Sequence, residues 1–170
     1  MIHAKNWMNP IKFSLLISMV WMAALSSTVQ AATDIEFETL DGKTVKLSDF
    51  RGKWVVVNYW ATWCPPCRVE MPELGFFYDA HKDKNAVVLG VNYEDNSPSQ
   101  VKTFLEQEDI KFPIVRQKGR IDGKTTPFGP LRGLPTTYMV SPKGEVVAAR
   151  TGMVDQKMLE EFIRKYDAKK

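Results

Sequence analysis

The stretch WATWCPPCRVEMP, residues 60–72, contains both cysteines of this chain of 170 residues. Cys64 and Cys67 are separated by two prolines, and the mostly apolar run KWVVVNYW, residues 53–60, leads into them. That run is rich in β-branched residues and predicts a buried central strand. A helix is expected over residues 65–81, because prolines are tolerated in a first helical turn. The cysteines therefore lie where a buried strand passes into a helix.

Three uses of such a cysteine pair can be compared: a structural staple, part of a metal site and a redox-active dithiol. A disulfide between these cysteines closes a very short loop, which stabilises a fold by only about 2 kcal/mol in the chain-entropy model. A structural zinc site needs about four Cys or His ligands, and besides the pair the chain offers only His3 and His81. Covalent haem attachment needs a histidine directly after the second cysteine, where Arg68 stands. The pattern favours a dithiol that cycles between reduced and oxidised forms, with no metal and no cofactor beyond the disulfide itself.

The chain begins with the pattern of a secretory signal peptide, residues 1–31. Lys5 and Lys12 form a weakly basic start, and the run FSLLISMVWMAAL is apolar apart from two serines. Val29 and Ala31 then match the small-residue pattern of a cleavage site. We therefore expect cleavage after Ala31.

An uncleaved membrane anchor is the alternative for this segment, because residues 11–29 are almost long enough to span a bilayer with little tilt. In both cases residues 32–170 form one redox domain outside the cytosol. Cleavage removes two lysines and no acids, which lowers the formal net charge from +3 to +1. A nearly neutral domain does not favour nucleic-acid binding, which needs a basic face.

The rest of the chain alternates predicted strands and helices without an internal repeat. With 44% hydrophobic and 25% charged residues, the chain suits one soluble domain with a packed core. Strand–helix units followed by a hairpin predict an α/β fold with a mixed central sheet. The core-facing positions expected on the first helix are Val69, Leu74, Phe77 and Tyr78. The other expected elements are strands in IEFETLDGKTVKL, AVVLGVNYE and FPIVRQ, a helix from Pro98, a hairpin around residues 142–144 and a last helix capped by Asp155.

The stretch VVNYWATWCPPCRVEMPEL closely resembles the thioredoxin superfamily and, more narrowly, the exported TlpA/ResA-type thiol–disulfide reductases. The segment DGKTVKLSDFRGKWVVVNYWATWC resembles the amino-terminal addition of those proteins, and GVNYED resembles their strand that ends in an acidic residue. GLPTTYMVSPKGEVV resembles the segment with the thioredoxin cis-proline. The resemblance covers residues 35–166. It implies a thioredoxin-like fold, with a central mixed β-sheet flanked by helices and an added amino-terminal β-hairpin.

The resemblance also implies a role for individual residues. Cys64 would be the nucleophile and Cys67 the resolving thiol of a redox-active disulfide. Trp63 would flank the nucleophile on the substrate side. Pro135, after a cis peptide bond, would present backbone groups to a bound substrate strand, with Leu134 beside it.

The polar residues near the pair depart from the thioredoxin pattern. Thioredoxins carry a buried Asp at the position of Asn58, which does not titrate. Glu70 stands where TlpA/ResA-type proteins carry a glutamate, and on a helix it shares a face with Cys67. In a partly apolar pocket such a Glu would have a raised pKa and exchange protons with a thiol; a solvated surface Glu is the alternative. Glu94, which ends its strand near the same end of the sheet, is a weaker candidate for this role.

The two prolines of the motif bear on the direction of electron transfer. Pro65 and Pro66 each lack a backbone N–H, so two donors to a Cys64 thiolate are missing. A less stabilised thiolate means a less stabilised reduced form, and this predicts a reducing dithiol.

We therefore expect an exported reductant of protein disulfides. By resemblance, such a protein keeps cysteines of exported proteins reduced, as in cytochrome c maturation, and receives electrons from a membrane protein. We expect a monomer in the bacterial periplasm or on the outer face of the cytoplasmic membrane. A thiol oxidase or isomerase and a non-catalytic thioredoxin-like binding module are the alternatives. A peroxidase is disfavoured, because Ala61 and Val57 stand where peroxiredoxins need a Thr or Ser and a Pro.

Overall fold

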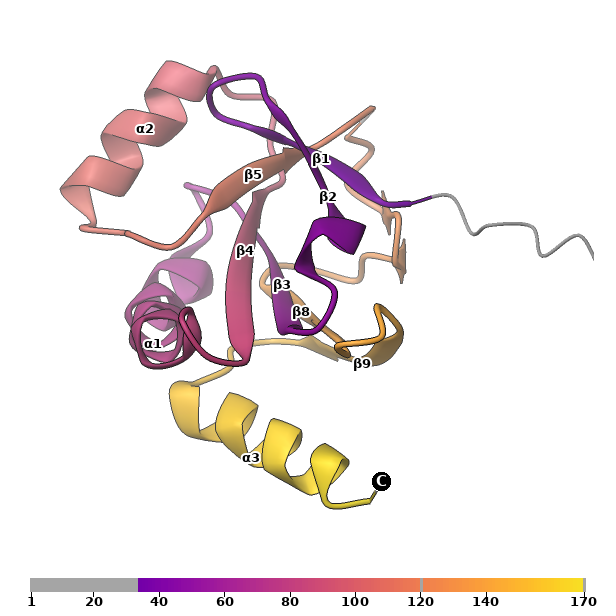
Figure 1. Cartoon of the computed structure of the whole chain (residues 1–170). Helices are drawn as coiled ribbons and strands as arrows, with labels where there is room; N and C mark the ends of the chain where they lie inside the picture. The colour runs from indigo at the N-terminus through magenta and orange to yellow at the C-terminus, as the bar shows by residue number, and fades with distance from the viewer. Residues whose placement is uncertain (1–33, 120, 170) are drawn as a thin grey trace, which may run out of the picture. The chain divides into compact units, whose positions relative to one another are not determined.

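The computed structural model describes residues 34–119 and 121–169, and the predicted signal peptide lies outside these residues. Within them, seven strands form one mixed sheet in the order β2-β1-β5-β4-β3-β8-β9 (Figure 1). The strands are β1 (Glu36–Thr39), β2 (Thr44–Lys46), β3 (Trp54–Trp60), β4 (Ala86–Asn92), β5 (Ile114–Gln117), β8 (Thr136–Val140) and β9 (Val146–Thr151). The predicted amino-terminal hairpin is present as β1 and β2, and it joins the sheet through β5.

Strand β3 lies inside the sheet, parallel to β4 and antiparallel to β8. All seven of its residues are buried, as expected for a strand that is rich in β-branched and aromatic residues and covered on both faces. Val56 and Trp60 point to one core cluster, whereas Val57 and Tyr59 point to the other. The predicted central strand is therefore confirmed.

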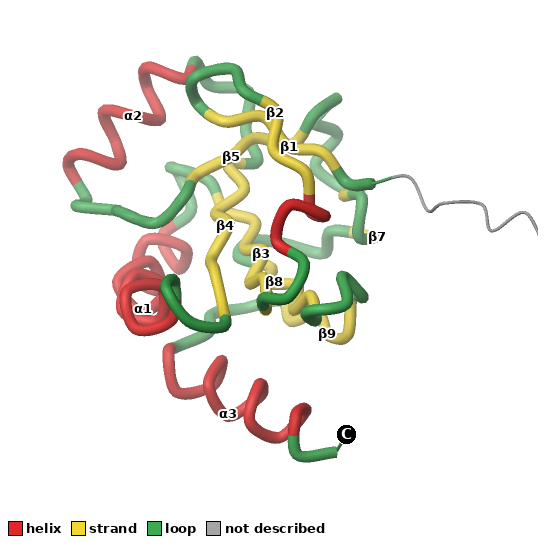
Figure 2. Tube along the Cα trace, in the orientation of Figure 1, coloured by secondary structure: helices red, strands yellow, loops and turns green. Residues whose placement is uncertain are grey.

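Three helices pack on the face towards which Trp60 points: α1 (Pro65–His81), α2 (Pro98–Gln107) and α3 (Gln156–Asp167) (Figure 2). The connections β3–α1–β4 and β4–α2–β5 both join parallel strands and proceed in the same direction across the sheet. Because such crossovers are right-handed, their helices lie on the same face. The ring of Trp60 stacks on Phe104 of α2, with centroids 5.5 Å apart.

The other face of the sheet is covered by shorter segments. The 3₁₀-helix η2 (Leu47–Phe50) contributes Leu47 to this second core cluster. Residues 121–131 add Phe128 and Leu131, and they include the short strand pair β6 (Thr125–Thr126) and β7 (Gly129–Pro130).

The expected mixed sheet flanked by helices is confirmed, and so is the cap of the last helix, where Asp155 accepts a hydrogen bond from the Met158 N–H at 2.7 Å. The prediction that Val69 faces the core is wrong, because this side chain is 67% exposed. The buried positions of α1 follow a helical spacing that turns Val69 outward; they are Cys67, Glu70, Met71, Leu74 and Phe77.

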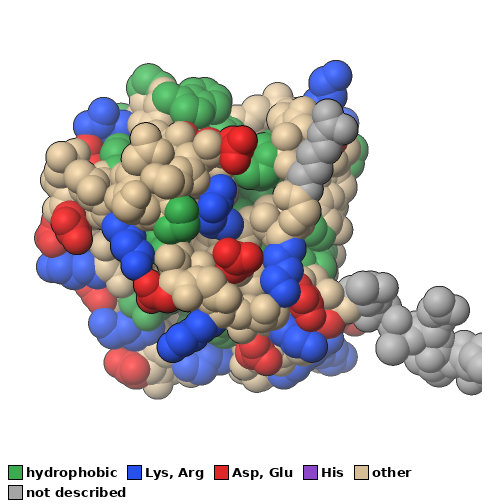
Figure 3. Space-filling view, turned by 90° about the horizontal axis from the view of Figure 1, so that it is seen from above, with side chains coloured by type: hydrophobic (Ala, Val, Ile, Leu, Met, Phe, Trp, Pro, Cys, Tyr) green, Lys and Arg blue, Asp and Glu red, His purple; other side chains and the backbone are tan. Residues whose placement is uncertain are grey.

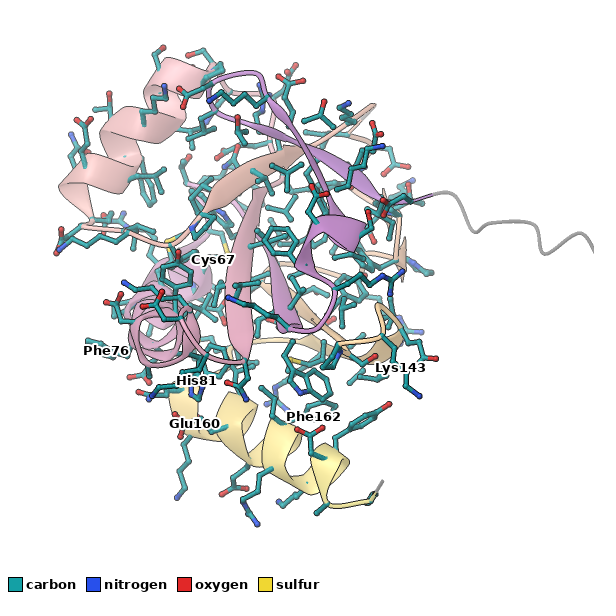
Figure 4. All side chains as sticks on the ribbon, in the orientation of Figure 1. Cys67, Phe76, His81, Lys143, Glu160 and Phe162 are labelled. Atoms are coloured by element: carbon teal, nitrogen blue, oxygen red, sulfur yellow. A yellow bond between two sulfur atoms is a disulfide. The ribbon has the colours of Figure 1, made fainter. Side chains whose placement is uncertain are left out.

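The first and last helices of the described chain meet far from the cysteines. Cys67 lies at the start of α1, whereas His81 lies at its other end beside Glu160 of α3 (Figure 4). The His81 Nε2 atom is 3.1 Å from Glu160 Oε1. This contact helps to dock α3 against the helix that carries the dithiol.

The outer surface carries a mixed distribution of charge. On the face shown in Figure 3, Lys and Arg side chains are interspersed with Asp and Glu side chains. Within residues 34–119 and 121–169, no helix is both long and apolar enough to cross a membrane.

Candidate active site

The two cysteines form a disulfide at the junction between β3 and α1, with their Cα atoms 5.3 Å apart. Cys64 is the N-cap of α1, and its backbone is extended, with φ −93° and ψ 102°. Pro65 and Pro66 occupy the first helical positions, where a missing N–H costs no intrahelical hydrogen bond. The sequence therefore places Cys64 at the positive end of a helix without extending the helix through it.

Hydrogen bonding to the Cys64 sulfur is sparse. In the part of the chain that the structure describes, the only hydrogen-bond donor to Cys64 Sγ is the backbone N–H of Cys67, at 3.3 Å. Cys64 is 2% exposed and Cys67 is fully buried, so exposure separates the two sulfurs only weakly in this oxidised form. The two cysteines differ more in their position, because Cys64 caps α1 whereas Cys67 lies inside its first turn.

Glu70 is 2% exposed and lies on the same buried side of α1 as Cys67. Its Oε1 accepts a hydrogen bond from Asn58 Nδ2 at 2.7 Å, and its Oε2 accepts one from the Val154 N–H at 2.9 Å. Desolvation raises the pKa of Glu70 to about 7, although the hydrogen bonds from Val154 and Asn58 act in the opposite direction. The surface alternative for Glu70 is therefore excluded, and this carboxyl group titrates near neutral pH.

Asn58 connects Glu70 to the sheet. Its Nδ2 also donates to Thr137 Oγ1 at 3.0 Å, and the antiparallel register of β3 and β8 places these two residues opposite each other. Asn58 thus supplies two donated hydrogen bonds and no titratable group beneath the dithiol. The contribution of Thr137 is not predicted from the sequence, although a pair of threonines in the apolar run TTYMV is a signal for it.

Glu94 lies just after β4 and is 7% exposed. Its Oε1 accepts hydrogen bonds from the Thr62 N–H at 2.9 Å and from Asn92 Nδ2 at 2.7 Å. Its Oε2 accepts a third from Thr62 Oγ1 at 3.0 Å. The structure therefore ties Glu94 to the turn that precedes Cys64, whereas Glu70 lies on the helix that follows it.

The proposed substrate-binding residues lie on two loops, one directly before Cys64 and one directly before β8. Trp63, directly before Cys64, is 68% exposed. The Leu134–Pro135 peptide bond is cis, as the resemblance implied. The carbonyl of Pro135 accepts a hydrogen bond from the Gly152 N–H at 2.9 Å, so it is already used within the protein. Within the described chain, the backbone groups of Leu134 make no hydrogen bond, which leaves Leu134 as the residue with backbone groups to offer.

A shallow groove lies beside Glu70, between α1 and the start of α3. Its exposed apolar side chains are Val69, Met153 and Met158, with exposed fractions of 67%, 47% and 37%. The groove is lined by Val69, Glu70, Glu73, Met153, Val154, Asp155 and Met158. Val154 contributes the backbone N–H that donates to Glu70, and no sequence pattern indicates this contact.

Within the described residues, no group of three or more His, Cys, Asp or Glu side chains is arranged to hold an ion. Ala61, three residues before Cys64, is buried and offers no hydroxyl at the position that a peroxidase needs. The chemistry that this arrangement supports is thiol–disulfide exchange, with a titratable carboxyl group beside the buried cysteine.

Comparison with known proteins agrees with this chemistry. The chain matches the AhpC/TSA family over residues 28–149. It is 36% identical over 126 residues to the thiol-disulfide oxidoreductase ResA of Bacillus thuringiensis subsp. konkukian, covering 74% of this chain and 70% of that protein. ResA of Halalkalibacterium halodurans is 35% identical over 143 residues, covering 82% of this chain and 77% of that protein.

Solved structures show the same fold. StoA from Bacillus subtilis superposes with a TM-score of 0.63 at 26% identity, covering 76% of this chain and 96% of StoA. A putative thiol:disulfide interchange protein DsbE from Chlorobium tepidum superposes with a TM-score of 0.65 at 28% identity, covering 79% of this chain and 93% of that one. With its disulfide at the start of α1, the chain belongs to the AhpC/TSA family and is a thioredoxin-fold thiol–disulfide oxidoreductase of the ResA type.

Proposed function

We propose that this protein is an exported reductant that transfers two electrons from its Cys64/Cys67 dithiol to disulfides of partner proteins. The observation that carries the direction of transfer is the sparse hydrogen bonding of Cys64 Sγ, which receives only the Cys67 N–H among the described residues. Pro65 and Pro66 lack the N–H groups of the first two helical positions. The N–H of the second position, missing at Pro66, is one from which an N-cap side chain otherwise accepts. A thiolate with few donors stabilises the reduced form little, so the disulfide form is favoured and the dithiol is reducing.

The reaction proceeds through a mixed disulfide. The Cys64 thiolate attacks one sulfur of the partner disulfide and releases the other as a thiolate. Cys67 then loses its proton and attacks Cys64 Sγ, which forms the Cys64–Cys67 disulfide and releases the partner as a dithiol. Glu70, with a pKa of about 7, is suited to accept the Cys67 proton near neutral pH.

Partner docking would use the exposed elements around the disulfide. The Trp63 indole supplies an exposed apolar surface before Cys64, and Leu134 supplies unpaired backbone groups on the loop before β8. The apolar side of the groove, with Val69 and Met153, would add a second apolar surface between α1 and α3. Disulfide-bearing proteins, including those handled in cytochrome c maturation, are the proposed substrates of a monomeric protein that a membrane electron donor re-reduces.

Export to the periplasm or to the outer face of the cytoplasmic membrane is proposed from the pattern of residues 1–31. We expect amino-terminal sequencing of the exported protein to give a start near Ala32. A membrane-bound protein that still begins with Met1 would show instead that the segment is an anchor.

The first prediction separates the roles of the two cysteines. Cys67→Ser should accumulate mixed disulfides with partner proteins, because the resolving attack on Cys64 is lost. Cys64→Ser should accumulate none, and it serves as the matched control. Non-reducing electrophoresis of both variants measures the trapped species, and equal trapping would contradict the assignment.

The second prediction concerns the reduction potential. Equilibration with glutathione should give a value of about −250 mV or lower, near the thioredoxin end of the known range. Pro66→Ala restores the N–H at the second helical position, from which an N-cap side chain accepts. One added charge-assisted hydrogen bond should raise the potential by about 30 mV or more and lower the Cys64 thiol pKa.

Pro65→Ala is the control for this experiment, because the N–H of the first helical position does not reach the cap side chain. Equal shifts in the two variants would show that a restored donor is not the cause. A potential of about −120 mV for the unmodified protein, typical of strongly oxidising dithiols, would overturn the reductant proposal.

The third prediction concerns Glu70. Glu70→Gln keeps the shape of the side chain and removes its charge, so the apparent thiol pKa should fall by about one unit. Turnover in insulin reduction should slow about tenfold or more, because a proton acceptor is lost. The pH dependence of thiol alkylation, read beside circular dichroism, measures the first effect. Coincident alkylation curves and unchanged turnover would remove Glu70 from the mechanism.

The pH dependence of the free energy of unfolding should show the titration of Glu70 independently. The pKa of Glu70 is raised in the folded, oxidised protein from 4.5 to about 7. Its contribution to stability is therefore fully present below about pH 4.5 and is lost as the pH rises through about 7. The free energy of unfolding should fall by about 3 kcal/mol across this range, and Glu70→Gln should flatten that dependence.

A further inference from the structure

The turn between β3 and α1 carries the reactive sulfur, and one residue of this turn is held from the neighbouring strand. Thr62 donates both its backbone N–H and its hydroxyl to the carboxylate of Glu94. Asn92, the last residue of β4, donates to the same carboxylate and orients it. Glu94 is thus a clamp between β4 and the turn, and each of its oxygens accepts at least one hydrogen bond.

Trp63 follows Thr62 directly, so the clamp acts next to its backbone. Its indole makes no hydrogen bond or ring contact with the residues that the structure describes, and it is 68% exposed. The neighbours of Trp63 therefore act on it through the backbone. Cys64 on one side is fixed by the start of α1 and by its N–H, which donates to the Ala61 carbonyl at 3.2 Å. Thr62 on the other side is fixed by Glu94.

We propose that Glu94 is a positioning residue for partner proteins: through Thr62 it holds the turn that presents Trp63 to a partner that docks beside Cys64. This inference rests on the proposed function, because it assigns the docking surface of that same site. It gives Glu94 a role that differs from proton exchange with the dithiol. The thiol chemistry itself should then proceed without Glu94, whereas the recognition of a large substrate should not.

The charge of Glu94 is not needed for this role. In Glu94→Gln the amide oxygen can accept from the Thr62 N–H and from Asn92, as Oε1 does. The amide nitrogen can donate to Thr62 Oγ1, because a hydroxyl both donates and accepts. All three contacts survive with the Thr62 hydroxyl reversed. A proton carrier, by contrast, cannot be replaced by an amide, so this variant distinguishes the two roles.

The test is a pair of single-turnover measurements with the reduced full-length protein. One substrate is insulin, which must dock, and the other is the small disulfide 5,5′-dithiobis(2-nitrobenzoate), which needs little docking. For Glu94→Ala we expect the second-order rate constant with insulin to fall about tenfold, the effect of losing two hydrogen bonds to the turn. The rate constant with the small disulfide should stay within about twofold. Glu94→Gln should restore insulin reduction to within about threefold of the unmodified protein.

Thr62→Val and Thr62→Ser form a matched pair that avoids the removal of a buried carboxylate. Thr62→Val loses the hydroxyl and should slow insulin reduction about threefold or more, whereas Thr62→Ser keeps the hydroxyl and should retain the rate. Circular dichroism checks that each variant is folded. This pair keeps the test decisive even where Glu94→Ala does not fold.

Three outcomes would overturn the inference. Equal losses with insulin and with the small disulfide would show a general structural role. A loss in Glu94→Gln with both substrates would show proton transfer. An unchanged insulin rate in Glu94→Ala and Thr62→Val would show that the clamp does not position the docking surface. Failure of the unmodified protein to reduce insulin would count against the proposed function instead.

Discussion

Burial of β3 between two hydrogen-bonded neighbours is the constraint on which the redox site depends. Its parallel pairing with β4 brings the carboxyl ends of both strands to one edge of the sheet, so Glu94 meets the turn that follows β3. Its antiparallel pairing with β8 places Thr136 opposite Tyr59, which brings the preceding Pro135 to the same edge. Three segments that are distant in sequence therefore converge where β3 gives way to Cys64.

The carboxyl groups of Glu70 and Glu94 lie near this edge, and they accept hydrogen bonds from different sets of donors. Glu70 accepts two hydrogen bonds, and burial still raises its pKa to about 7. Glu94 accepts three, two of them from the single residue Thr62. A carboxyl group that titrates near neutral pH is free to exchange a proton. Glu94 is held to a turn through both of its oxygens. The carboxyl group that we propose for proton handling therefore lies on α1, and the one that we propose for positioning lies just after β4.

Much of this fold is predictable, because the decisive patterns are local. The apolar run before Cys64 identifies the central strand, and the residue type of Asp155 is enough to mark the start of the last helix. The prediction for Val69 fails because apolar character alone does not tell which side of α1 faces the sheet. Burial of Glu70 is one of two alternatives that the sequence leaves open, since it depends on the Val154 N–H, which lies 84 residues away.

The clamp on Thr62 is not predictable at all, because a threonine in a turn and a glutamate after a strand are ordinary at their positions. Only the register of β3 and β4 shows that they meet. Every residue type except proline has a backbone N–H, so the residue type of Thr62 does not indicate that its N–H donates to Glu94. Strand register is therefore the information that a sequence pattern lacks, and at this site the register of β3 and β4 brings Glu94 to Thr62.

Asn58 and Glu70 occupy the two positions where thioredoxins and TlpA/ResA-type proteins, respectively, carry an acidic residue, and a hydrogen bond joins them. Its Nδ2 lies 2.7 Å from Glu70 Oε1 and donates to it. An aspartate at this position, as in thioredoxins, would place a second carboxylate within hydrogen-bond distance of the first. Two carboxylates at such a short distance share one proton, and one of their two pKa values rises strongly. A neutral donor at position 58 leaves Glu70 as the single titrating acid beneath the dithiol. The amide at position 58 donates a hydrogen bond to Glu70, the carboxyl group that we propose as the proton acceptor.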